Sequence, residues 1–272
     1  MTNLSRRNLI KLSLGGALGL AAGASATACA GTPPTPAQTE GPFHPLGRRR
    51  AADGTVIEED RRLLQLVDKD ADLTFVADKH GTAYGRQVVV TGLVRDEQDQ
   101  PLSGALVEIW QACVTGRYNH RSDPSREWLD PSFQYWGRAT TDAAGRYAFR
   151  TIVPGAYRAD SSWIRPPHIH YKIARRGYQD LTTQLYFRGT GFYYDGRMYQ
   201  ADVLERLNER DQILAGVPRD QRERVIAALR DARQGEAVPA GLKVCDMDIT
   251  LRAVPRAGGT QPVSDDLGQL LL

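Results

Sequence analysis

The chain has 272 residues, with 35 basic and 32 acidic side chains and a formal net charge of +3. The length suits one domain of moderate size with enough residues to bury a core. So small a net charge argues against a nucleic-acid or anionic-membrane surface. No stretch approaches the ~20 apolar residues that a membrane-spanning helix needs.

The N-terminus has the pattern of an export signal. Arg6 and Arg7 form a twin-arginine pair, and a Gly/Ala/Leu-rich run over residues 12–26 follows them. This run is too short and too rich in glycine to be a membrane span. We therefore predict that residues 1–28 are a twin-arginine signal and that the protein acts in the periplasm or elsewhere outside the cytoplasm.

The site of signal cleavage is open between two alternatives. Cleavage after Ala26 gives an ordinary exported protein, whereas cleavage after Ala28 leaves Cys29 first and available for a lipid anchor. A signal of either length removes three basic residues and no acids, so the bases fall from 35 to 32 and equal the 32 acids. Two further cysteines, Cys113 and Cys245, are expected as separate buried thiols, with a disulfide between them as the alternative.

The rest of the chain is predicted to form an extended arm, a domain of strands and a tail. Residues 29–60 are rich in Pro and Thr in their first half and indicate an extended arm or linker. Residues 61–255 form the predicted β-sandwich domain, and residues 256–272 a flexible tail. Alternation and turn residues predict strands over 88–94, 105–110, 146–150, 168–173, 181–187 and 243–251.

Two segments have helical spacing, at residues 202–215 and 219–233. Short strands separated by Gly/Asp turns are typical of an antiparallel β-sandwich. The expected fold is therefore all-β. It has an antiparallel sandwich core, an extended N-terminal arm and one or two covering helices near the C-terminus.

The strand over 168–173 carries two of the five histidines of the chain. His168 and His170 are two residues apart, so on a strand both side chains point to one face while Ile169 points to the other. Their Cα atoms would lie roughly 6.5 Å apart, which lets two imidazoles converge on one metal ion. A His-x-His pair alone also occurs in packing and surface roles.

Two tyrosines could complete a metal site. Tyr118 follows Gly-Arg in a turn-rich segment, and Tyr157 follows Pro-Gly-Ala. Phenolate is a hard anionic oxygen donor that suits ferric iron, and neutral imidazole is tolerated by the same ion. The alternatives to metal binding are an exposed loop position for Tyr118 and a structural role for Tyr157, as a corner tyrosine that bonds backbone. His120 is the rival of Tyr118, and we expect it to be a surface residue or a partner of a ligand.

The motifs together resemble one family. In order they are Gly-Leu-Val-Arg-Asp at 92–96, Pro-Leu-Ser-Gly-Ala-Leu-Val-Glu-Ile-Trp-Gln at 101–111, Gly-Arg-Tyr at 116–118, Gly-Arg-Tyr-Ala-Phe-Arg-Thr-Ile-Val-Pro-Gly-Ala-Tyr at 145–157 and Arg-Pro-Pro-His-Ile-His at 165–170. This run resembles the intradiol ring-cleavage dioxygenases, and among them the protocatechuate 3,4-dioxygenase β chain. The likeness covers about residues 37–255.

The resemblance implies a non-haem ferric ion held by Tyr118, Tyr157, His168 and His170. It also implies that Tyr157 leaves the ion when substrate binds, that Arg165 is the active-site arginine and that Gln184 supports the site. The expected reaction cleaves a catechol-type ring between its two hydroxyl-bearing carbons with O2. The product is a muconate-type diacid, and a protocatechuate-like substrate is favoured. The family further implies a homo-oligomer or an α-type partner chain.

Some residues depart from the β-chain pattern. Arg158 stands where that chain has proline, Pro167 replaces alanine, and the loop between Tyr157 and Arg165 is two residues shorter. These changes lie beside the expected substrate pocket and bear on the substrate more than on the metal.

Alternative interpretations remain. Half of the pattern is shared with non-catalytic surface β-sandwich modules, so a binding module outside the cytoplasm is the second hypothesis. A zinc hydrolase built on His168 and His170 is the third, and it lacks a third ligand at suitable spacing. We expect His44 and His80 to be solvated, and Trp110 and Trp163 to be packing residues.

Overall fold

The computed structural model of the chain describes residues 31–45, 48–50, 56–58, 71–77 and 79–255. The predicted signal, Cys29 and the predicted tail lie outside the described residues, and what we expect of them stays a prediction. Within the described part, no helix is both long and apolar enough to cross a membrane.

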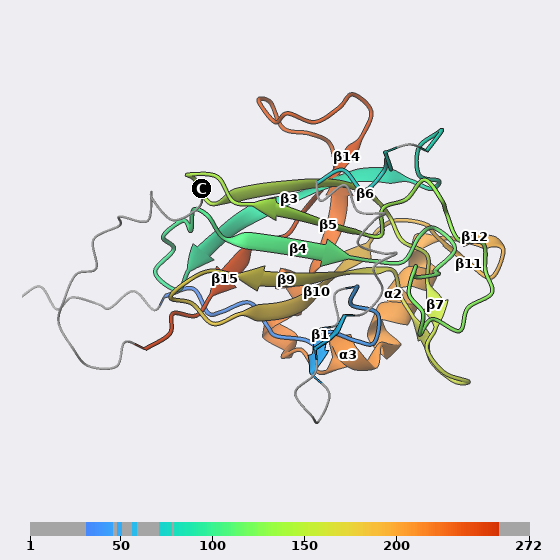
Figure 1. Cartoon of the computed structure of the whole chain (residues 1–272), viewed down its shortest axis with the longest axis horizontal. Helices are drawn as coiled ribbons and strands as arrows, with labels where there is room; N and C mark the ends of the chain where they lie inside the picture. The colour runs from blue at the N-terminus through green and yellow to red at the C-terminus, as the bar shows by residue number, and fades with distance from the viewer. Residues whose placement is uncertain (1–30, 46–47, 51–55, 59–70, 78, 256–272) are drawn as a thin grey trace, which may run out of the picture. The chain divides into compact units, whose positions relative to one another are not determined.

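Strands dominate the structure (Figure 1). In chain order they are β1 (Arg48–Arg50), β2 (Val56–Glu58), β3 (Gln87–Asp96), β4 (Leu106–Trp110), β5 (Trp136–Thr140), β6 (Arg146–Ile152), β7 (Tyr157–Arg158), β8 (Ile164–Arg165), β9 (His168–Ala174), β10 (Leu181–Arg188), β11 (Phe192–Tyr194), β12 (Arg197–Tyr199), β13 (Ile226–Arg230), β14 (Lys243–Asp246) and β15 (Ile249–Leu251). The helices are α2 (Ala201–Arg210), α3 (Gln212–Ala215) and the 3₁₀ helix η1 (Arg219–Arg224).

Nine strands form one mixed sheet in the order β15-β3-β14-β13-β10-β9-β4-β5, with β6 paired to β3. β5, at one end of this order, also contacts β6, which is paired to β3 near the other end. The sheet therefore nearly closes on itself (Figure 1). The pairs β1–β2, β7–β8 and β11–β12 are separate two-stranded hairpins. The all-β class is therefore confirmed in a barrel-like form, and the division into two sandwiched layers stays a prediction.

The core follows from strand alternation. On β9 the apolar residues Ile169, Tyr171 and Ile173 are fully buried in the main hydrophobic cluster. His168 and His170 lie on the opposite face, as a period of two requires. Both histidines are also buried, because other elements cover that second face. A core on one face of β9 and a polar site on the other is the arrangement that positions the site.

The expectation of a purely antiparallel sheet is wrong. β10 pairs with β13, and β3 pairs with both β14 and β15, in parallel. Parallel neighbours need a long connection between them. The segments between β10 and β13 and between β3 and β14 provide it.

The second predicted helix, at 219–233, is also wrong. Residues Arg219–Arg224 form a 3₁₀ helix, and Ile226–Arg230 form β13. β13 fills the place between β10 and β14, so ladder pairing overrides a local pattern that also suits a helix. The first predicted helix is present as α2 and α3, which are separated by Asp211.

Residues 31–45 contain no helix or strand and lie along the sheet. Thr35 N donates to Thr250 O at 3.0 Å, and Gln38 N donates to Thr182 O at 2.8 Å. These bonds join the N-terminal arm to β15 and β10. The arm therefore reaches the polar face of β9, where the candidate site lies.

Candidate active site

Strand β9 supplies both histidines of the site. Its pairing with β10 sets His170 opposite Gln184 and His168 opposite Tyr186. The two imidazole rings lie 4.8 Å apart between centroids, with their Nε2 atoms 3.2 Å apart. The convergence predicted from the His-x-His spacing is therefore present.

Two tyrosines from different segments meet the histidines. Tyr118 lies in the loop after β4, and Tyr157 begins β7. Their rings are 5.6 Å apart, the Tyr157 and His168 rings are 5.7 Å apart, and Tyr118 Oη lies 3.4 Å from His168 Nε2. Gly116 allows this approach, because a Cβ at that position would lie 2.1 Å from Ala156 O.

The hydrogen bonding of His168 leaves one nitrogen facing the other candidate ligands. His168 Nδ1 lies 2.7 Å from Pro166 O and donates to that carbonyl, so Nε2 carries the free lone pair. Tyr118 Oη, Arg165 Nη1 and His170 Nε2 all lie within 3.4 Å of Nε2. More groups converge on this nitrogen than one lone pair can accept. The donor set therefore fits a cation held between the two tyrosines and the two histidines.

Burial fixes the protonation states of this group. The pKa values of His168 and His170 lie well below the usual value, because burial disfavours the charged ring and neighbouring positive groups add to the effect. Burial also raises the pKa of Tyr118 well above its usual value and raises that of Tyr157, on which Arg165 acts in the opposite direction. Neutral imidazoles are ready ligands, whereas both phenols require a bound cation to ionise.

Arg165 is held by a dense network. Its Nε donates to Asp211 Oδ2 at 3.0 Å, and its Nη2 donates to Gln184 Oε1 and to Tyr186 Oη, each at 2.9 Å. Only 4% of Arg165 and none of Asp211 is exposed. Burial alone would lower the pKa of Arg165, but Tyr186, Tyr157 and Asp211 outweigh it and raise that pKa, so the guanidinium stays charged.

Gln184 serves this network and not the ligand cluster directly. Its Oε1 accepts from Arg165 and from Tyr186 Oη, and its Nε2 donates to Thr39 O at 2.9 Å. The structure thus places Gln184 beside Arg165, as an orienting partner that also joins the arm to the site.

Sequence reasoning missed Asp211 and Tyr186. Asp211 lies between α2 and α3 and accepts from Leu214 N at 2.9 Å, so it also caps α3. The available signal was an Asp inside a helical pattern, which is typical of an N-cap. Tyr186 Oη lies 3.1 Å from Asp211 Oδ1, so its one proton can go to this carboxylate or to Gln184 Oε1. The alternation of Tyr186 with Gln184 on β10 was the only sequence signal that it faces the site.

The arm covers the ligand cluster. Phe43 stacks on Tyr118 at 4.6 Å, and a Cβ on Gly41, whose φ is +72°, would lie 3.3 Å from His170 Cε1. His44 packs edge-on against Trp110 at 4.6 Å, and Trp110 stacks on His170 at 4.8 Å. The expectation that His44 is solvated is therefore wrong, because the path of the arm folds it against an indole.

The remaining candidates lie away from the cluster. His80 is exposed, whereas His120 is half-buried, contacts Phe43 at 5.8 Å between ring centroids and accepts from Ser122 N. Cys113 and Cys245 are buried free thiols, so the disulfide alternative is wrong. In the part of the chain that the structure describes, no three His, Cys, Asp or Glu side chains are grouped to hold a metal, which gives the zinc interpretation no third ligand.

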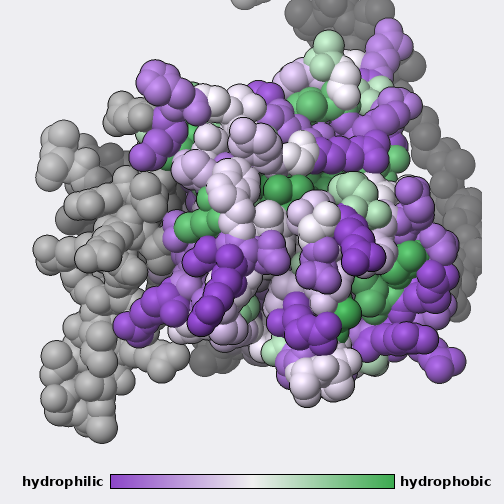
Figure 2. Space-filling view, turned by 90° about the vertical axis from the view of Figure 1, so that its right-hand side faces the viewer, coloured by the Kyte–Doolittle hydropathy of each residue, from purple (hydrophilic) through white to green (hydrophobic). Residues whose placement is uncertain are grey.

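A cavity of about 750 Å³ opens in front of the site. Tyr157 and Arg165 line it together with residues of the arm, of the β7–β8 hairpin and of the β11–β12 hairpin. Figure 2 shows the end of the molecule that carries these hairpins, where hydrophilic side chains cover most of the face and hydrophobic residues lie between them. The cavity gives a small molecule a route from solvent to Tyr157.

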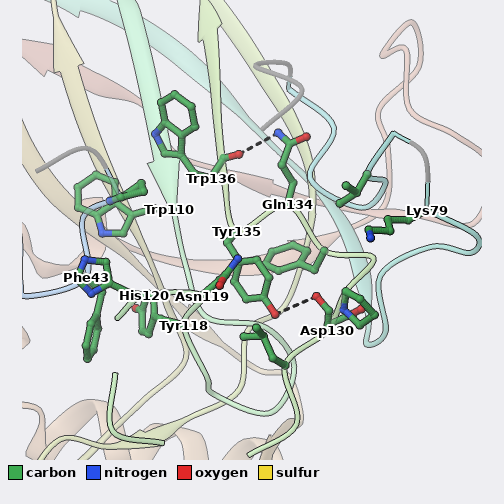
Figure 3. Close-up of a pocket in the computed structure, with 15 residues that line it drawn as sticks. Phe43, Lys79, Trp110, Tyr118, Asn119, His120, Asp130, Gln134, Tyr135 and Trp136 are labelled. Carbon is green, nitrogen blue, oxygen red and sulfur yellow. Dashed lines mark hydrogen bonds between the residues drawn. The ribbon is translucent and has the colours of Figure 1, made fainter. Parts of the chain in front are cut away.

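A smaller cavity of about 220 Å³ adjoins Tyr118 on the side of Trp136 and Tyr135 (Figure 3). Its polar groups largely bond one another: Tyr135 Oη donates to Asp130 O at 3.0 Å and Gln134 Nε2 donates to Trp136 O at 2.9 Å. Neither Tyr157 nor Arg165 lines it, whereas both line the larger cavity. The larger cavity is therefore the candidate substrate pocket.

Comparisons with known proteins identify the family of the chain. The chain matches the family model described as Dioxygenase over residues 64–235. It is 39% identical over 189 residues to the protocatechuate 3,4-dioxygenase β chain of Burkholderia cepacia, covering 67% of this chain and 72% of that protein. It is 32% identical over 116 residues to a chlorocatechol 1,2-dioxygenase of Pseudomonas sp. strain P51, covering 38% of this chain and 44% of that protein.

A solved structure agrees as well. The dioxygenase domain of a dioxygenase carbohydrate-binding protein fusion from Streptomyces sp. SirexAA-E superposes with a TM-score of 0.50 at 25% identity, covering 82% of this chain and 100% of that one. The family model and these relatives place the chain in a class of catechol-type dioxygenases. More particularly, the chain belongs to the intradiol ring-cleaving dioxygenases. Membership of an enzyme family favours catalysis over the binding-module alternative.

Proposed function

We propose that the protein is a non-haem Fe(III) dioxygenase that cleaves a catechol-type ring between its two hydroxyl-bearing carbons. Both atoms of O2 enter the product, and the broken carbon–carbon bond yields a muconate-type diacid. The observation that carries the proposal is the convergence of Tyr118, Tyr157, His168 and His170 behind a cavity that a small molecule can enter.

Tyr118, Tyr157, His168 and His170 would hold the iron. When bound, a ferric ion would supply Lewis-acid chemistry that lowers the pKa values of the substrate hydroxyls. The chain must then receive the released protons. Tyr157 is the ligand suited to this task, because it is half-buried and lines the cavity, whereas Tyr118 is only 3% exposed and stacked under Phe43.

Arg165 has an electrostatic role in this proposal. Its guanidinium is charged, buried and fixed by Asp211, Gln184 and Tyr186, so it does not reorganise during the reaction. Preorganised charge of this kind stabilises negative charge that develops on a substrate. Arg165 lines the cavity together with Tyr157, where a bound diol would lie.

The finer parts of the proposal rest on the relatives. A protocatechuate-like substrate is supported by the resemblance and by the name of the 39% identical β chain. The same relative and a protocatechuate 3,4-dioxygenase α chain of Pseudomonas putida, 29% identical over 157 residues, support a partner chain or an oligomer. Export by the twin-arginine route is proposed from Arg6, Arg7 and the Gly/Ala/Leu-rich run over residues 12–26, and it predicts that lysine at positions 6 and 7 traps an active precursor in the cytoplasm.

Iron content and product formation test the proposal together. The purified full chain should bind about one iron per chain, be reddish from tyrosinate-to-iron charge transfer and convert catechol to a muconate-type diacid with uptake of O2. A protein that stays colourless and iron-free after ferric loading would refute the metal assignment. A protein that binds iron without cleaving any catechol would refute the activity.

A further inference from the structure

The cavity in front of the site is far larger than one catechol ring. Its volume is about 750 Å³. By comparison, a cavity of ~150 Å³ already accommodates benzene, and pockets of ~300–1,000 Å³ hold ligands of several rings. Two hydroxyl groups add little to the size of benzene. Most of the cavity is therefore available to a substituent on the ring.

The cavity runs from a buried end to an exposed mouth. Arg165 and Ala156 are buried at the inner end, whereas Arg158, Asp160 and Glu127 are exposed at the mouth. Half-buried aromatic residues, Trp163 and Tyr194, lie between these extremes. Trp163 borders the inner end directly, because its ring lies 5.4 Å from the Arg165 guanidinium.

The aromatic residues at mid-depth are held in place by the chain itself. Arg158 Nη2 donates to Tyr194 Oη at 3.1 Å, and Arg158 Nη1 donates to Ser161 O at 3.0 Å, which joins the β7–β8 hairpin to Tyr194 of β11. Asp160 Oδ1 accepts from Trp163 N at 2.8 Å and fixes the backbone that carries the indole. Arg158 is the residue that stands where the β-chain pattern has proline, so this bridge belongs to a feature in which the chain departs from that pattern.

We infer that the substrate is a catechol carrying a second aromatic ring, and that this second ring packs on Trp163 and Tyr194. The inference rests on the proposed ring cleavage and specifies its substrate class. Aromatic pairs add about 0.5–1.5 kcal/mol beyond area burial, so a stacked second ring gains binding that a single ring cannot.

Charge at the mouth selects against an acidic substituent. Asp123, Glu127, Asp160 and Asp195 line the cavity, against the cations Arg158 and Arg165. Arg165 is already paired with Asp211. A substituent would therefore meet four acidic side chains and one arginine, Arg158. A neutral aromatic substituent suits this lining better than a carboxylate, so on this point the inference departs from the protocatechuate-like substrate that the name of the 39% identical β chain suggests.

The test compares substrates on the iron-loaded full chain. We expect kcat/KM for 4-benzylcatechol to exceed the values for catechol and protocatechuate by about tenfold, from the stacking of the second ring. Trp163→Ala and Tyr194→Ala should each lower the ratio of kcat/KM for 4-benzylcatechol to that for catechol by about three- to tenfold. Met198→Ala is the control, because Met198 is 65% exposed on the same β11–β12 hairpin and does not line the cavity. It should leave the ratio unchanged.

A binding measurement separates this inference from the proposed function. Under nitrogen, 4-benzylcatechol should bind about tenfold more tightly than catechol, and Trp163→Ala should remove the difference. If catechol and protocatechuate are cleaved as fast as or faster than 4-benzylcatechol, or if the two variants leave the ratio unchanged, the inference is wrong while the ring cleavage stands. If no catechol is cleaved and the two-ring preference persists in binding, the proposed function is wrong and the aromatic subsite stands.

Discussion

Two arginines of one hairpin, Arg165 and Arg158, show how differently the inner end and the mouth of the pocket are built. Arg165 is 4% exposed and bonded to Asp211, Gln184 and Tyr186 on β10 and at the α2–α3 junction. Arg158 is exposed, and its side chain donates to a loop carbonyl and to Tyr194. The inner end is thus fixed by several distant segments, whereas the mouth is a local construction of two hairpins. We therefore expect substitutions at the mouth to change the substrate preference and to leave the proposed metal site intact.

The largest expected effect is at the innermost residue. His168→Ala should remove nearly all bound iron, because it deletes the nitrogen on which the other candidate ligands converge. His120→Ala is the matched control and should retain iron, since His120 bonds Ser122 N outside the ligand cluster. Metal analysis and the visible spectrum read out both variants. Loss of iron from the control alone would show that the ligands are assigned wrongly.

Removal of Asp211 should cost the most stability. Asp211→Ala leaves the buried guanidinium of Arg165 without its carboxylate, and breaking a buried pair in this way costs about 3–5 kcal/mol. Asp248→Ala is the control, because its pair with Arg95 is 48% and 29% exposed. Exposed pairs contribute about 0.2–1 kcal/mol. Denaturant unfolding measures the loss in free energy of unfolding for both variants. Equal losses would mean that burial of the Arg165–Asp211 pair does not determine its contribution to stability.

Arg165→Lys tests charge placement at the inner end. The lysine keeps the charge but cannot form the forked bonds to Asp211, Gln184 and Tyr186. We expect iron and colour to remain while kcat falls by about 10²–10³, the cost of one misplaced electrostatic stabiliser. Arg188→Lys, at a partly exposed pair with Glu223, is the control and should keep full turnover. Unchanged kcat in the first variant would reduce Arg165 to a structural residue.

The smallest effect is expected at the mouth. Arg158→Ala removes two exposed hydrogen bonds and should change the free energy of unfolding by less than about 1 kcal/mol. It frees Tyr194, so the kcat/KM ratio of 4-benzylcatechol to catechol should fall about two- to threefold, less than in Tyr194→Ala. A stability loss as large as that of Asp211→Ala would contradict the distinction between the two ends of the pocket.

Local sequence patterns predicted the parts of the site that depend on one segment. The alternation in β9 placed His168 and His170 on one face and Ile169 in the core, as the structure shows. Tyr118 and Tyr157 were found through ordered motifs and lie beside them. The register of the two histidines is local and can be read from one short segment, whereas the meeting of the tyrosines with the histidines depends on the fold and was expected only from the ordered motifs taken together.

The missed features depend on distant segments. Asp211 and Arg165 are 46 positions apart in the chain, and no sequence pattern around either residue predicts that they pair. Val225 and Ile226 fit a helical stripe, yet the pairing of β13 with β10 decides their conformation. His44 was placed in solvent because its contact with Trp110 depends on the route of an arm without regular structure. Tertiary pairing overrode local preference at each of these positions.

The way the sheet closes along β3 has a consequence for biogenesis. Residues Lys243–Asp246 and Ile249–Leu251 pair with one edge of a strand that begins at Gln87, so that edge has no neighbour until the last strands of the domain have been synthesised. An unpaired strand edge is a template for pairing with other chains, and long-range pairing of this kind forms slowly. A ribosome-bound chain halted before residue 243 should therefore be insoluble or held by chaperones, and the enzyme should fold only after its final strands emerge.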